Sequence, residues 1–482
     1  GTLKGLESKL GYLARLGVTA LWISPVFKQP SWDNYAYHGY AIQNFLDVDP
    51  HFGTRQDLRD MVDTAHRLGI RVILDVILNH AGDVFGYRAD RYPEFNGQSY
   101  EVEGFRDEFG HANQRFGPVD VERHPRAWPN RAVWPAELQE PGTFSRKGRI
   151  NNWDRDPEYL EGDFHGLKDI DHGWHERDMA GIRKLDAFHP SAALAVLCEV
   201  YKFWIAFADI DGFRIDTVKH MEIGATRHFA LAIHEFAQSL GKENFLLVGE
   251  ITGGRTRAFE TMELTGLDAA LGVDEIGRKL DEVPKGKCDP AEYFALFRNS
   301  AVMGRESHAW FGRHVVTMLD DHDQVWKNGH KARFCADPGN EGNFRFLLPA
   351  IALNLLTLGI PCLYYGTEQG FDGWGDNDRF LRECMFGGQF GSLQSAGHHF
   401  FNEDHPTYRE IARLAAVRHQ HLALRRGRQY LREVSISGTE GDFAAPRLVS
   451  GQLRGIVAWS RLFAGSEVLC AINTDPDNTA IA

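Results

Sequence analysis

The stretch LGIRVILDVILNH (68–80) carries the pattern that decides the fold. A Leu-Gly pair closes a helix-like segment and an apolar, β-branched run follows at once, because glycine readily takes the left-handed conformation that ends a helix. Three more Leu-Gly pairs precede strand-like runs in the same way, within residues 16–24, 240–250 and 358–366. Helices that alternate with compact strands are typical of repeated αβ units, and therefore of a parallel sheet.

Periodicity places further elements along the chain. Apolar residues recur every three or four positions in the segments predicted to be helical, which are 2–16, 54–68, 192–208, 225–240 and 406–424. Strands are expected at 18–24, 71–78, 210–216, 245–250, 267–271, 314–320 and 361–366. A closed (β/α)8 barrel needs one strand more, and the chain begins in a helix, so we expect the first strand upstream of Gly1.

The predicted fold is therefore α/β, a (β/α)8 TIM barrel formed by residues 1–80 and 186–425, with two additions. Residues 81–185 are far more than a simple return to the sheet needs and lack a periodic apolar pattern, which indicates an inserted irregular domain. Alternating apolar runs in 426–482 predict a C-terminal antiparallel β domain, short for a complete sandwich.

Composition excludes several classes of protein. The net charge of −13 argues against nucleic acid or an anionic membrane as partner, and no apolar run reaches the roughly 18 residues of a membrane span. The six cysteines show no metal-type spacing and are expected to be small buried apolar residues. A nucleotide-binding protein would need a GxGxxG turn after a strand or a Walker lysine loop, and neither is found.

Polar side chains gather at the ends of the predicted strands. In a (β/α)8 barrel the loops after the strands surround one cavity, where the chemistry takes place. The residues concerned are Asn79 and His80, Arg214 and Asp216, Lys219 and His220, Glu250, and the run Asp320–Asp323. One carboxylate after a strand is usually a capping or loop residue, whereas carboxylates at the same end of three strands indicate a catalytic site.

Three carboxylates in one cleft suit the cleavage of a glycosidic bond. Arg214 precedes Asp216 by two residues and shares its face of the strand, so its charge would keep Asp216 ionised as the nucleophile. Glu250 has no cation beside it in the sequence. An apolar setting would raise its pKa, as a general acid requires.

At these residues the sequence resembles the α-amylase family of glycoside hydrolases. Four short regions match the signatures of that family in order, namely DVILNH (75–80), GFRIDTVKH (212–220), LVGEI (247–251) and LDDHD (319–323). The stretches 16–27, 35–40 and 359–371 are also similar. The resemblance implies that Asp216 is the nucleophile, Glu250 the acid/base, and Asp323 a third carboxylate that orients the sugar and stabilises the transition state.

The resemblance also implies a set of substrate-binding residues: His38, Tyr40, His80, Arg214, Lys219, His220 and His322. Tyr40 would stack on the sugar with His38 beside it, and Arg214 would contact the nucleophile. His80 and His322 would form hydrogen bonds to the same sugar. Lys219 and His220 match a pair on the leaving-group side in members that act on α-1,4 bonds, and Asp75 matches a mostly structural aspartate.

Calcium is the implied cofactor, and no organic cofactor is expected. Asn79, Asp169 and the backbone carbonyl of His220 match the positions that hold Ca2+ in family members, and Ca2+ prefers oxygen ligands. His172 and His175 have a zinc-like spacing but no HExxH motif or cysteine partner, so we expect them to be surface histidines.

The main hypothesis is a retaining hydrolase of α-1,4 bonds in starch, maltooligosaccharides or related α-glucans. A transglycosylase of glucanotransferase or maltosyltransferase type shares every catalytic residue and is the alternative. Non-catalytic sugar-binding relatives typically lose one or more carboxylates, whereas this chain keeps three. Two departures concern the last motif: Asp321 stands where Asn is common, and Gln324, Val325 and Trp326 stand where an arginine often follows Asp323.

Overall fold

The computed structural model describes residues 1–34, 36–123, 130–297, 312–323, 326–327, 329–336, 342–387, 400–435 and 437–479. The chain divides into two compact units. The first comprises residues 1–10, 19–251 and 260–268, and the second comprises residues 11–18, 252–259 and 269–482.

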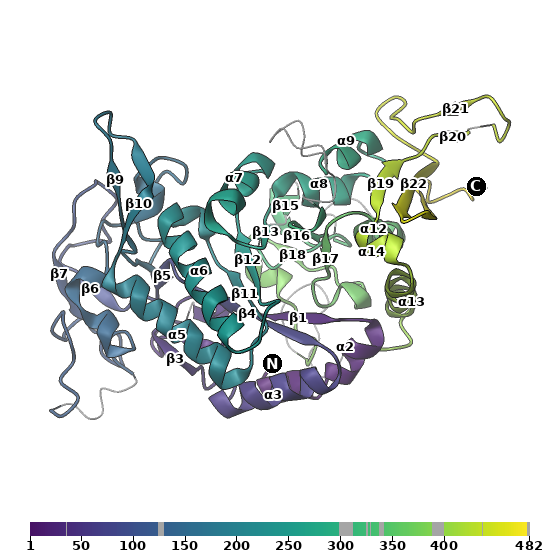
Figure 1. The fold of residues 1–482 in the computed structure, drawn as a ribbon. Helices are drawn as coiled ribbons and strands as arrows, with labels where there is room; N and C mark the ends of the chain where they lie inside the picture. Colours follow the sequence, from purple (N-terminus) through teal and green to yellow (C-terminus); the bar gives the residue numbers. More distant parts are fainter. Residues whose placement is uncertain are drawn as a thin grey trace. The chain divides into compact units, whose positions relative to one another are not determined.

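A parallel sheet forms the centre of the first unit. It contains β1 (Ala20–Ile23), β4 (Arg71–Val76), β11 (Gly212–Ile215) and β12 (Leu246–Glu250), paired in this order (Figure 1). Because neighbouring strands run in the same direction, their carboxyl ends lie along one edge of the sheet. The strand-end residues of three separate segments are thereby brought to one place.

Amphipathic helices cover this sheet. They are α1 (Leu3–Glu7), α3 (Arg55–Arg67), α5 (Ala192–Ala208) and α6 (Ile223–Ser239), and Figure 1 shows α5 beside α6. The spacing of Thr54 and Asp57 predicts a capping box at the start of α3, and the structure has it, with each side chain bonded to the other residue's backbone. The single helix predicted over 2–16 is wrong. The Ser8 hydroxyl donates to the carbonyl of Gly5, which competes with helical bonding, and a second helix, α2 (Leu10–Leu16), begins two residues later.

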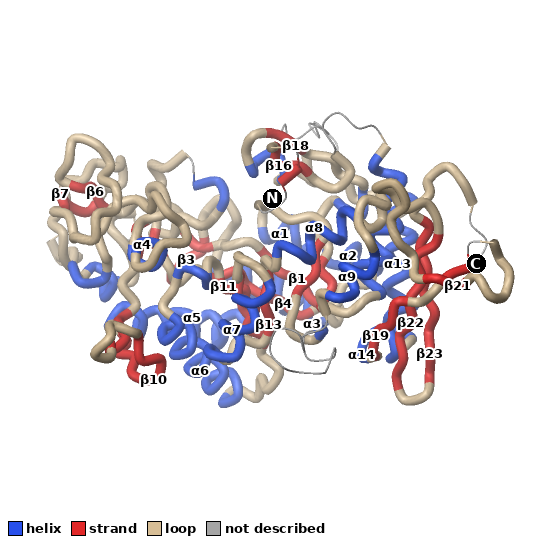
Figure 2. Tube along the Cα trace, turned by 90° about the horizontal axis from the view of Figure 1, so that it is seen from above, coloured by secondary structure: helices blue, strands red, loops and turns tan. Residues whose placement is uncertain are grey.

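Short elements joined by long loops fill much of the remaining first unit, as Figure 2 shows. The strands are β2 (Phe27–Lys28), β3 (Asn44–Val48), β5 (His80–Ala81), β6 (Phe85–Tyr87), β7 (Val102–Phe105), β8 (Lys168–Asp169), β9 (Gly173–Arg177) and β10 (Arg183–Pro190), with one short helix, α4 (Glu158–Glu161). Residues 81–185 are irregular, as expected. Their status as an inserted domain stays a prediction.

The second unit also contains parallel strands. β14 (Val316–Met318) pairs with β17 (Ile360–Cys362), and β13 (Ala269–Leu271) is bridged to β14. Its helices are α8 (Asp274–Glu282), α9 (Pro290–Ala295), α12 (Leu347–Leu356), α13 (Pro406–Gln420) and α14 (Leu422–Arg426), while α7 (Arg255–Thr265) belongs in part to each unit. Each of the seven expected strand segments therefore overlaps a strand, although β17 covers only the first two residues of the segment 361–366. The strand expected upstream of Gly1 stays a prediction.

Antiparallel strands dominate the end of the chain. β19 (Arg428–Leu431), β22 (Ile456–Phe463) and β23 (Ser466–Asn473) form one sheet, and β20 (Val434–Ser435) pairs with β21 (Phe443–Ala444). A further small antiparallel sheet joins β15 (Trp326–Lys327), β16 (His330–Ala332) and β18 (Trp374–Gly375). The antiparallel pattern predicted for the C-terminal segment is confirmed, and the boundary of that domain stays a prediction.

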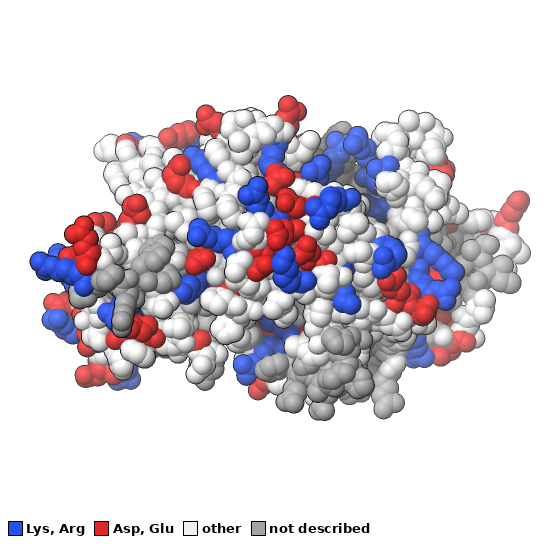
Figure 3. Space-filling model, turned by 90° about the horizontal axis from the view of Figure 1, so that it is seen from below, with Lys and Arg blue, Asp and Glu red and all other residues white. Residues whose placement is uncertain are grey.

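The expectation of small buried cysteines holds for three of the six. Cys198, Cys288 and Cys470 are buried, whereas Cys335, Cys362 and Cys384 are partly exposed. On the face drawn in Figure 3, acidic and basic side chains are interspersed. Within the described residues, no helix combines the length and hydrophobicity that a membrane crossing requires.

Candidate active site

One guanidinium group organises the candidate site of the first unit. The side chain of Arg214 is 3% exposed, and its Nη1 lies 2.6 Å from Asp216 Oδ1 and 3.0 Å from Asp75 Oδ1. Its Nη2 lies 3.0 Å from Glu250 Oε1. The strand register explains this arrangement, because Arg214 of β11 is paired with Asp75 of β4 on one side and with Val248 of β12 on the other. Side chains two residues apart on a strand share a face, so Asp216 and Glu250 meet the same cation.

Asp75 is fully buried and binds neighbouring side chains of the site through hydrogen bonds. Its Oδ2 accepts hydrogen bonds from Trp22 Nε1 at 3.1 Å and from the Tyr40 hydroxyl at 3.0 Å. The guanidinium of Arg214 also lies 5.2 Å from the centre of the Trp22 ring. These contacts fix the carboxylate and both aromatic rings, so Asp75 is placed for a positioning role.

The charges of this cluster do not balance. One guanidinium faces three carboxylates, so full ionisation would leave a net negative charge in a buried place. Burial raises the pKa of Asp75 to about 7, with the nearby charge of Asp216 acting in the same direction and the Arg214 charge opposing it. Although burial disfavours the cation, Asp75 and Glu250 raise the pKa of Arg214 well above its usual value.

Glu250 has a cation beside it, contrary to the expectation from the sequence. The sequence shows only neighbours along one strand, whereas the contact with Arg214 arises across two paired strands. The other oxygen of Glu250 accepts a hydrogen bond from the backbone N–H of Thr217 at 2.9 Å. Thr217 takes the left-handed conformation with φ 50° and ψ 37°, which is unusual for a β-branched residue. This strained turn directs its N–H toward Glu250, and nothing in the sequence predicted it.

Two of the predicted substrate-binding histidines are kept neutral. Burial lowers the pKa of His80, whose Nε2 is buried and meets no hydrogen-bond partner among the described residues. Burial also lowers the pKa of His220 to about 4, and its Nδ1 lies 2.8 Å from the carbonyl oxygen of Tyr159. A neutral imidazole can donate or accept a hydrogen bond without adding charge to the cluster.

Aromatic rings accompany these polar groups. His38 and Tyr40 stack with ring centres 5.8 Å apart, and His38 Nδ1 accepts a hydrogen bond from the Tyr40 backbone N–H at 3.0 Å. Phe164 and Trp153 pack edge-on against His220, at 4.6 and 5.6 Å. Trp153 is 38% exposed, so it offers apolar surface to solvent beside the imidazole.

Lys219 is oriented by an ion pair. Its Nζ lies 2.8 Å from Asp154 Oδ1, and the lysine side chain is 11% exposed. Asp154 itself is exposed and follows Trp153 in the chain. The sequence predicts Lys219 as a site residue, but it does not indicate Trp153 or Asp154, which belong to the irregular segment 81–185.

Two of the three predicted calcium-binding residues lie together. β5 and β8 pair His80 with Asp169, and the Ile170 N–H donates to the Asn79 carbonyl at 2.9 Å. Asn79 Oδ1 is buried, and no residue in the described part of the chain forms a hydrogen bond with it. Burial raises the pKa of Asp169 well above its usual value. An amide oxygen without a donor beside a buried carboxyl group fits the oxygen ligands that Ca2+ prefers.

The third predicted carboxylate belongs to the second unit. Asp323 lies in the loop after β14, and Lys331 of β16 places its Nζ 2.6 Å from Asp323 Oδ1 and donates to the Asp323 carbonyl as well. The Asp323 N–H donates to Asp321 Oδ1 at 2.5 Å. His322 Nδ1 lies 3.8 Å from the same Asp321 oxygen. The meeting of Asp323 with Asp216 and Glu250 stays a prediction.

Lys331 is a residue that the sequence did not indicate. The arginine often found after Asp323 in relatives is replaced here by Gln324, Val325 and Trp326. Lys331 reaches Asp323 from a strand eight residues further along the chain, where spacing gives no signal. The cation missing from the motif is thus supplied by another element.

His172 and His175 are buried rather than at the surface, so that expectation is wrong. His172 Nε2 lies 2.9 Å from the Leu78 carbonyl oxygen, and His175 Nε2 accepts from the Gly224 N–H at 3.1 Å. Long-range packing against β4 and α6 encloses both rings, which a local pattern cannot reveal. Among the described residues no group of three or more His, Cys, Asp or Glu side chains is arranged to hold a metal ion.

Comparison with known proteins agrees with this geometry. The family model "Alpha amylase, catalytic domain" matches residues 1–390, and the chain belongs to the α-amylase family of glycoside hydrolases and transferases. The chain is 30% identical over 472 residues to an alpha-amylase of Streptomyces lividans, covering 89% of this chain and 47% of that protein. It is 26% identical to a cyclomaltodextrin glucanotransferase of Bacillus sp. (strain 17-1), covering 80% and 46%. The chain thus spans about half the length of these relatives.

A solved structure is also similar. The alpha-amylase from Geobacillus thermoleovorans complexed with acarbose superposes with a TM-score of 0.65 at 22% identity, covering 98% of this chain and 81% of that one. At this identity the likeness concerns the fold. Structures of the family imply a (β/α)8 barrel with a C-terminal domain.

Proposed function

We propose that the chain is a retaining glycoside hydrolase that cleaves α-1,4-glucosidic bonds in starch, maltooligosaccharides or related α-glucans. The observation that carries the proposal is the contact of Asp216 and Glu250 with one buried guanidinium. Two carboxylates that share a guanidinium are separated by little more than the span of that group and two hydrogen bonds. The shared contact brings both carboxyl groups within reach of one glycosidic bond, and the retaining course by double displacement is what the family resemblance implies.

In the proposed mechanism, Asp216 attacks the anomeric carbon while Glu250 protonates the departing oxygen. Arg214 keeps Asp216 oriented by a bond of 2.6 Å and stabilises its negative charge. The Thr217 N–H and Arg214 hold the two oxygens of Glu250. Glu250 then deprotonates a water molecule, which attacks the glycosyl–Asp216 ester and restores the α configuration. Asp323 would stabilise the positive charge that develops on the sugar.

The surrounding residues take the roles of a sugar-binding site. Tyr40, backed by His38, offers a ring for the sugar, and the neutral His80 can bond a hydroxyl group without altering the charge. Lys219 and His220 would bind the sugar on the leaving-group side, with His322 on the cleaved sugar. Each of these roles rests on the family resemblance together with the contacts described above.

We propose calcium as a structural ion of this chain. Asn79 Oδ1, the carboxylate of Asp169 and the carbonyl of His220 would hold it, which would tie the end of β4 to the irregular segment. A bound Ca2+ would supply positive charge that offsets the burial of Asp169. The chemical steps themselves are carried by the carboxylates.

A transglycosylase is the second candidate, favoured by the similarity to a cyclomaltodextrin glucanotransferase over 80% of this chain. The two reactions differ in whether water or a sugar hydroxyl attacks the ester at Asp216. Product analysis separates them: a hydrolase yields shorter maltooligosaccharides, whereas a transferase also yields longer or cyclic ones.

The test follows the products of maltoheptaose by NMR with the full chain. We expect the first product to carry the α anomer, and we expect Asp216→Asn to lower kcat at least about 1,000-fold while the fold is kept. A β anomer formed first would refute retention. An Asp216→Asn variant with activity close to the parent would remove Asp216 from the mechanism.

A further inference from the structure

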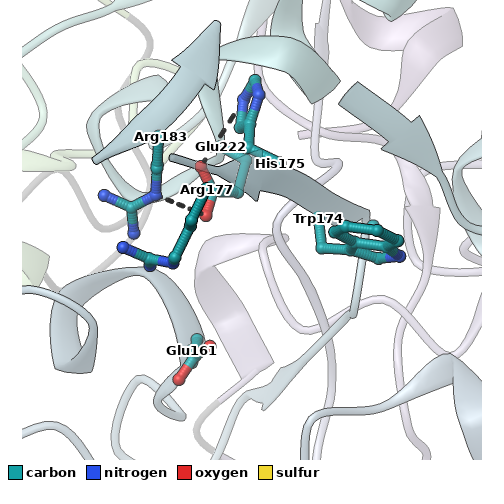
Figure 4. Close-up of a pocket in the computed structure, with 7 residues that line it drawn as sticks. Glu161, Trp174, His175, Arg177, Arg183 and Glu222 are labelled. Atoms are coloured by element: carbon teal, nitrogen blue, oxygen red, sulfur yellow. Dashed lines mark ion pairs between the residues drawn. The ribbon is translucent and has the colours of Figure 1, made fainter. Parts of the chain in front are cut away.

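The hairpin of β9 and β10 places one arginine between two carboxylates that are far apart in the chain. β10 begins at Arg183, and Figure 4 shows Glu222 beside its guanidinium. Arg183 Nε lies 3.2 Å from Glu222 Oε1. Arg183 Nη1 and Nη2 both contact Asp156, and Nη2 donates to Asp156 Oδ1 at 2.7 Å. All three nitrogens of the guanidinium are therefore engaged, and one cation joins the two carboxylates.

This bridge is specific to an arginine and partly shielded from water. The side chains of Arg183 and Glu222 are each 20% exposed. A planar guanidinium can hold one carboxylate with two parallel bonds and another through Nε, whereas a lysine offers a single ammonium group. Figure 4 also shows His175 on the other side of Glu222, with 3.8 Å between His175 Nε2 and Glu222 Oε2. Glu222 is thus fixed between two side chains of the hairpin.

The two bridged carboxylates belong to segments that border the proposed leaving-group side of the active site. Glu222 comes two residues after His220. Asp156 comes two residues after Asp154, the ion-pair partner of Lys219. We name these stretches the 153–159 segment and the 219–222 segment. The first comes from the irregular part of the chain, and the second follows the strand that carries Arg214.

Two direct contacts also join these segments. Lys219 Nζ lies 2.8 Å from Asp154 Oδ1, and His220 Nδ1 lies 2.8 Å from the carbonyl oxygen of Tyr159. The Asp154 side chain is 72% exposed, and an ion pair with such an exposed partner contributes little by itself. The bridge through Arg183 adds a more shielded connection between the same two segments.

We propose that Arg183 is a positioning residue for the leaving-group side, which acts by holding the 153–159 segment against the 219–222 segment. The identity of the sugar rests on the proposed function, whereas the joining of the segments rests on the contacts of Arg183. Arg183 orients the groups that contact the sugar and does not contact it itself. In a transfer reaction the attacking sugar hydroxyl occupies the same side, so Arg183 would also favour sugar over water as the acceptor.

The experiment compares two substrates that differ on the leaving-group side. Maltopentaose places sugar units there, whereas α-maltosyl fluoride has only a fluorine atom in their place. We expect Arg183→Met to lower kcat/KM for maltopentaose about tenfold, mainly through KM, and for α-maltosyl fluoride at most about twofold. Arg183→Lys keeps the charge but not the three-pronged bridge, so its loss should be intermediate. Arg88→Met, which removes an exposed pair with Glu101, is the matched control.

Further variants test whether Arg183 acts through its two carboxylates. Asp156→Asn, at a side chain that is 45% exposed, weakens the bridge from its outer end and should give the same substrate-dependent loss. In a chain with Asp156→Asn and Glu222→Gln, the addition of Arg183→Met should cost almost nothing more on maltopentaose, since its partners are already lost. Equal losses on the two substrates, or additive losses of the variants, would overturn the inference.

A binding measurement separates this inference from the proposed function. Calorimetry of chains that carry Asp216→Asn, which prevents turnover, should show that Arg183→Met weakens the binding of maltopentaose about tenfold. If the parent cleaves neither substrate, such a difference in binding would support the role of Arg183 and refute only the activity. Equal affinities with and without Arg183→Met, or no binding by either chain, would overturn the inference.

Discussion

Two acidic clusters of this chain are held by cations in different ways. In the first unit, Asp216, directly after β11, and Glu250, the last residue of β12, share the buried guanidinium of Arg214. In the second unit, Asp323 lies in a loop, has a side chain that is 41% exposed, and is held by Lys331. The first cluster depends on the register of a sheet, whereas the second lies in a loop and includes an ion pair with the short strand β16.

This difference indicates which of the two acidic clusters is more strongly constrained by the fold. Strand pairing fixes the positions of Arg214, Asp75 and Val248 through many backbone bonds, so the first cluster is rigid before substrate binds. A carboxylate in a loop with a side chain that is 41% exposed is less constrained than one fixed by strand pairing. Substitutions in the first cluster should therefore cost more than substitutions in the second.

The largest expected effect is that of Glu250→Gln. We expect kcat to fall about 100- to 10,000-fold on maltooligosaccharides, because the leaving oxygen then lacks its proton donor. An aryl maltoside with a strongly acidic phenol needs little protonation and should recover most of the rate of the first step. Loss of equal size on both substrates would contradict the role of Glu250 as general acid.

Removal of the shared cation should cost stability. Arg214→Met leaves Asp75, Asp216 and Glu250 without their buried partner, and breaking such a buried pair typically costs about 3–5 kcal/mol of unfolding free energy. Urea denaturation measures the change. Arg15→Met breaks an exposed pair with Glu403 and should cost at most about 1 kcal/mol. Similar losses for the two variants would show that the guanidinium is not a structural centre.

Removal of calcium tests whether Asn79 and Asp169, which lie where β5 pairs with β8, bind the ion. If Asn79 and Asp169 hold the ion, saturation with Ca2+ at 100 times its Kd should stabilise the chain by about 2.7 kcal/mol, and EDTA should remove this gain. Asn79→Ala should abolish the difference between the two conditions in a thermal melt, while Asn96→Ala, at an exposed position, should preserve it. A parent chain whose Tm is the same with Ca2+ and with EDTA would refute the calcium proposal.

Sequence periodicity predicted the scaffold of this chain well. The strand-end positions of Asp216 and Glu250 follow from apolar runs and their ends, and the capping box at Thr54 follows from spacing. Periodicity does not predict contacts between side chains of different strands, so the sequence did not indicate that Arg214 lies beside Glu250. The left-handed turn at Thr217 also has no local signal, since it lacks the glycine that such a turn favours.

Lys331 tests whether the loop carboxylate needs its ion pair. Lys331→Met should lower kcat about tenfold, or about 1.4 kcal/mol in activation free energy, since Asp323 loses one of the contacts that orient it. Lys331→Arg keeps the charge and should retain most of the activity. In an Asp323→Asn background the Lys331→Met substitution should add almost nothing, as expected for two residues that act together. Additive losses would assign Lys331 a role independent of Asp323.

The smallest effect concerns the buried His172. Burial lowers the pKa of His172 below its usual value of about 6.5, so the folded chain keeps the imidazole neutral while the unfolded chain protonates it. The folded state therefore binds fewer protons, and stability present above pH 6.5 is lost as the pH falls toward the lower pKa of the folded state. His172→Gln should flatten the fall in the urea midpoint between pH 7 and pH 5, whereas exposed His419→Gln should not. An unchanged slope in His172→Gln would mean that other groups carry the acid sensitivity, and the carboxylates around Arg214 would be the next to test.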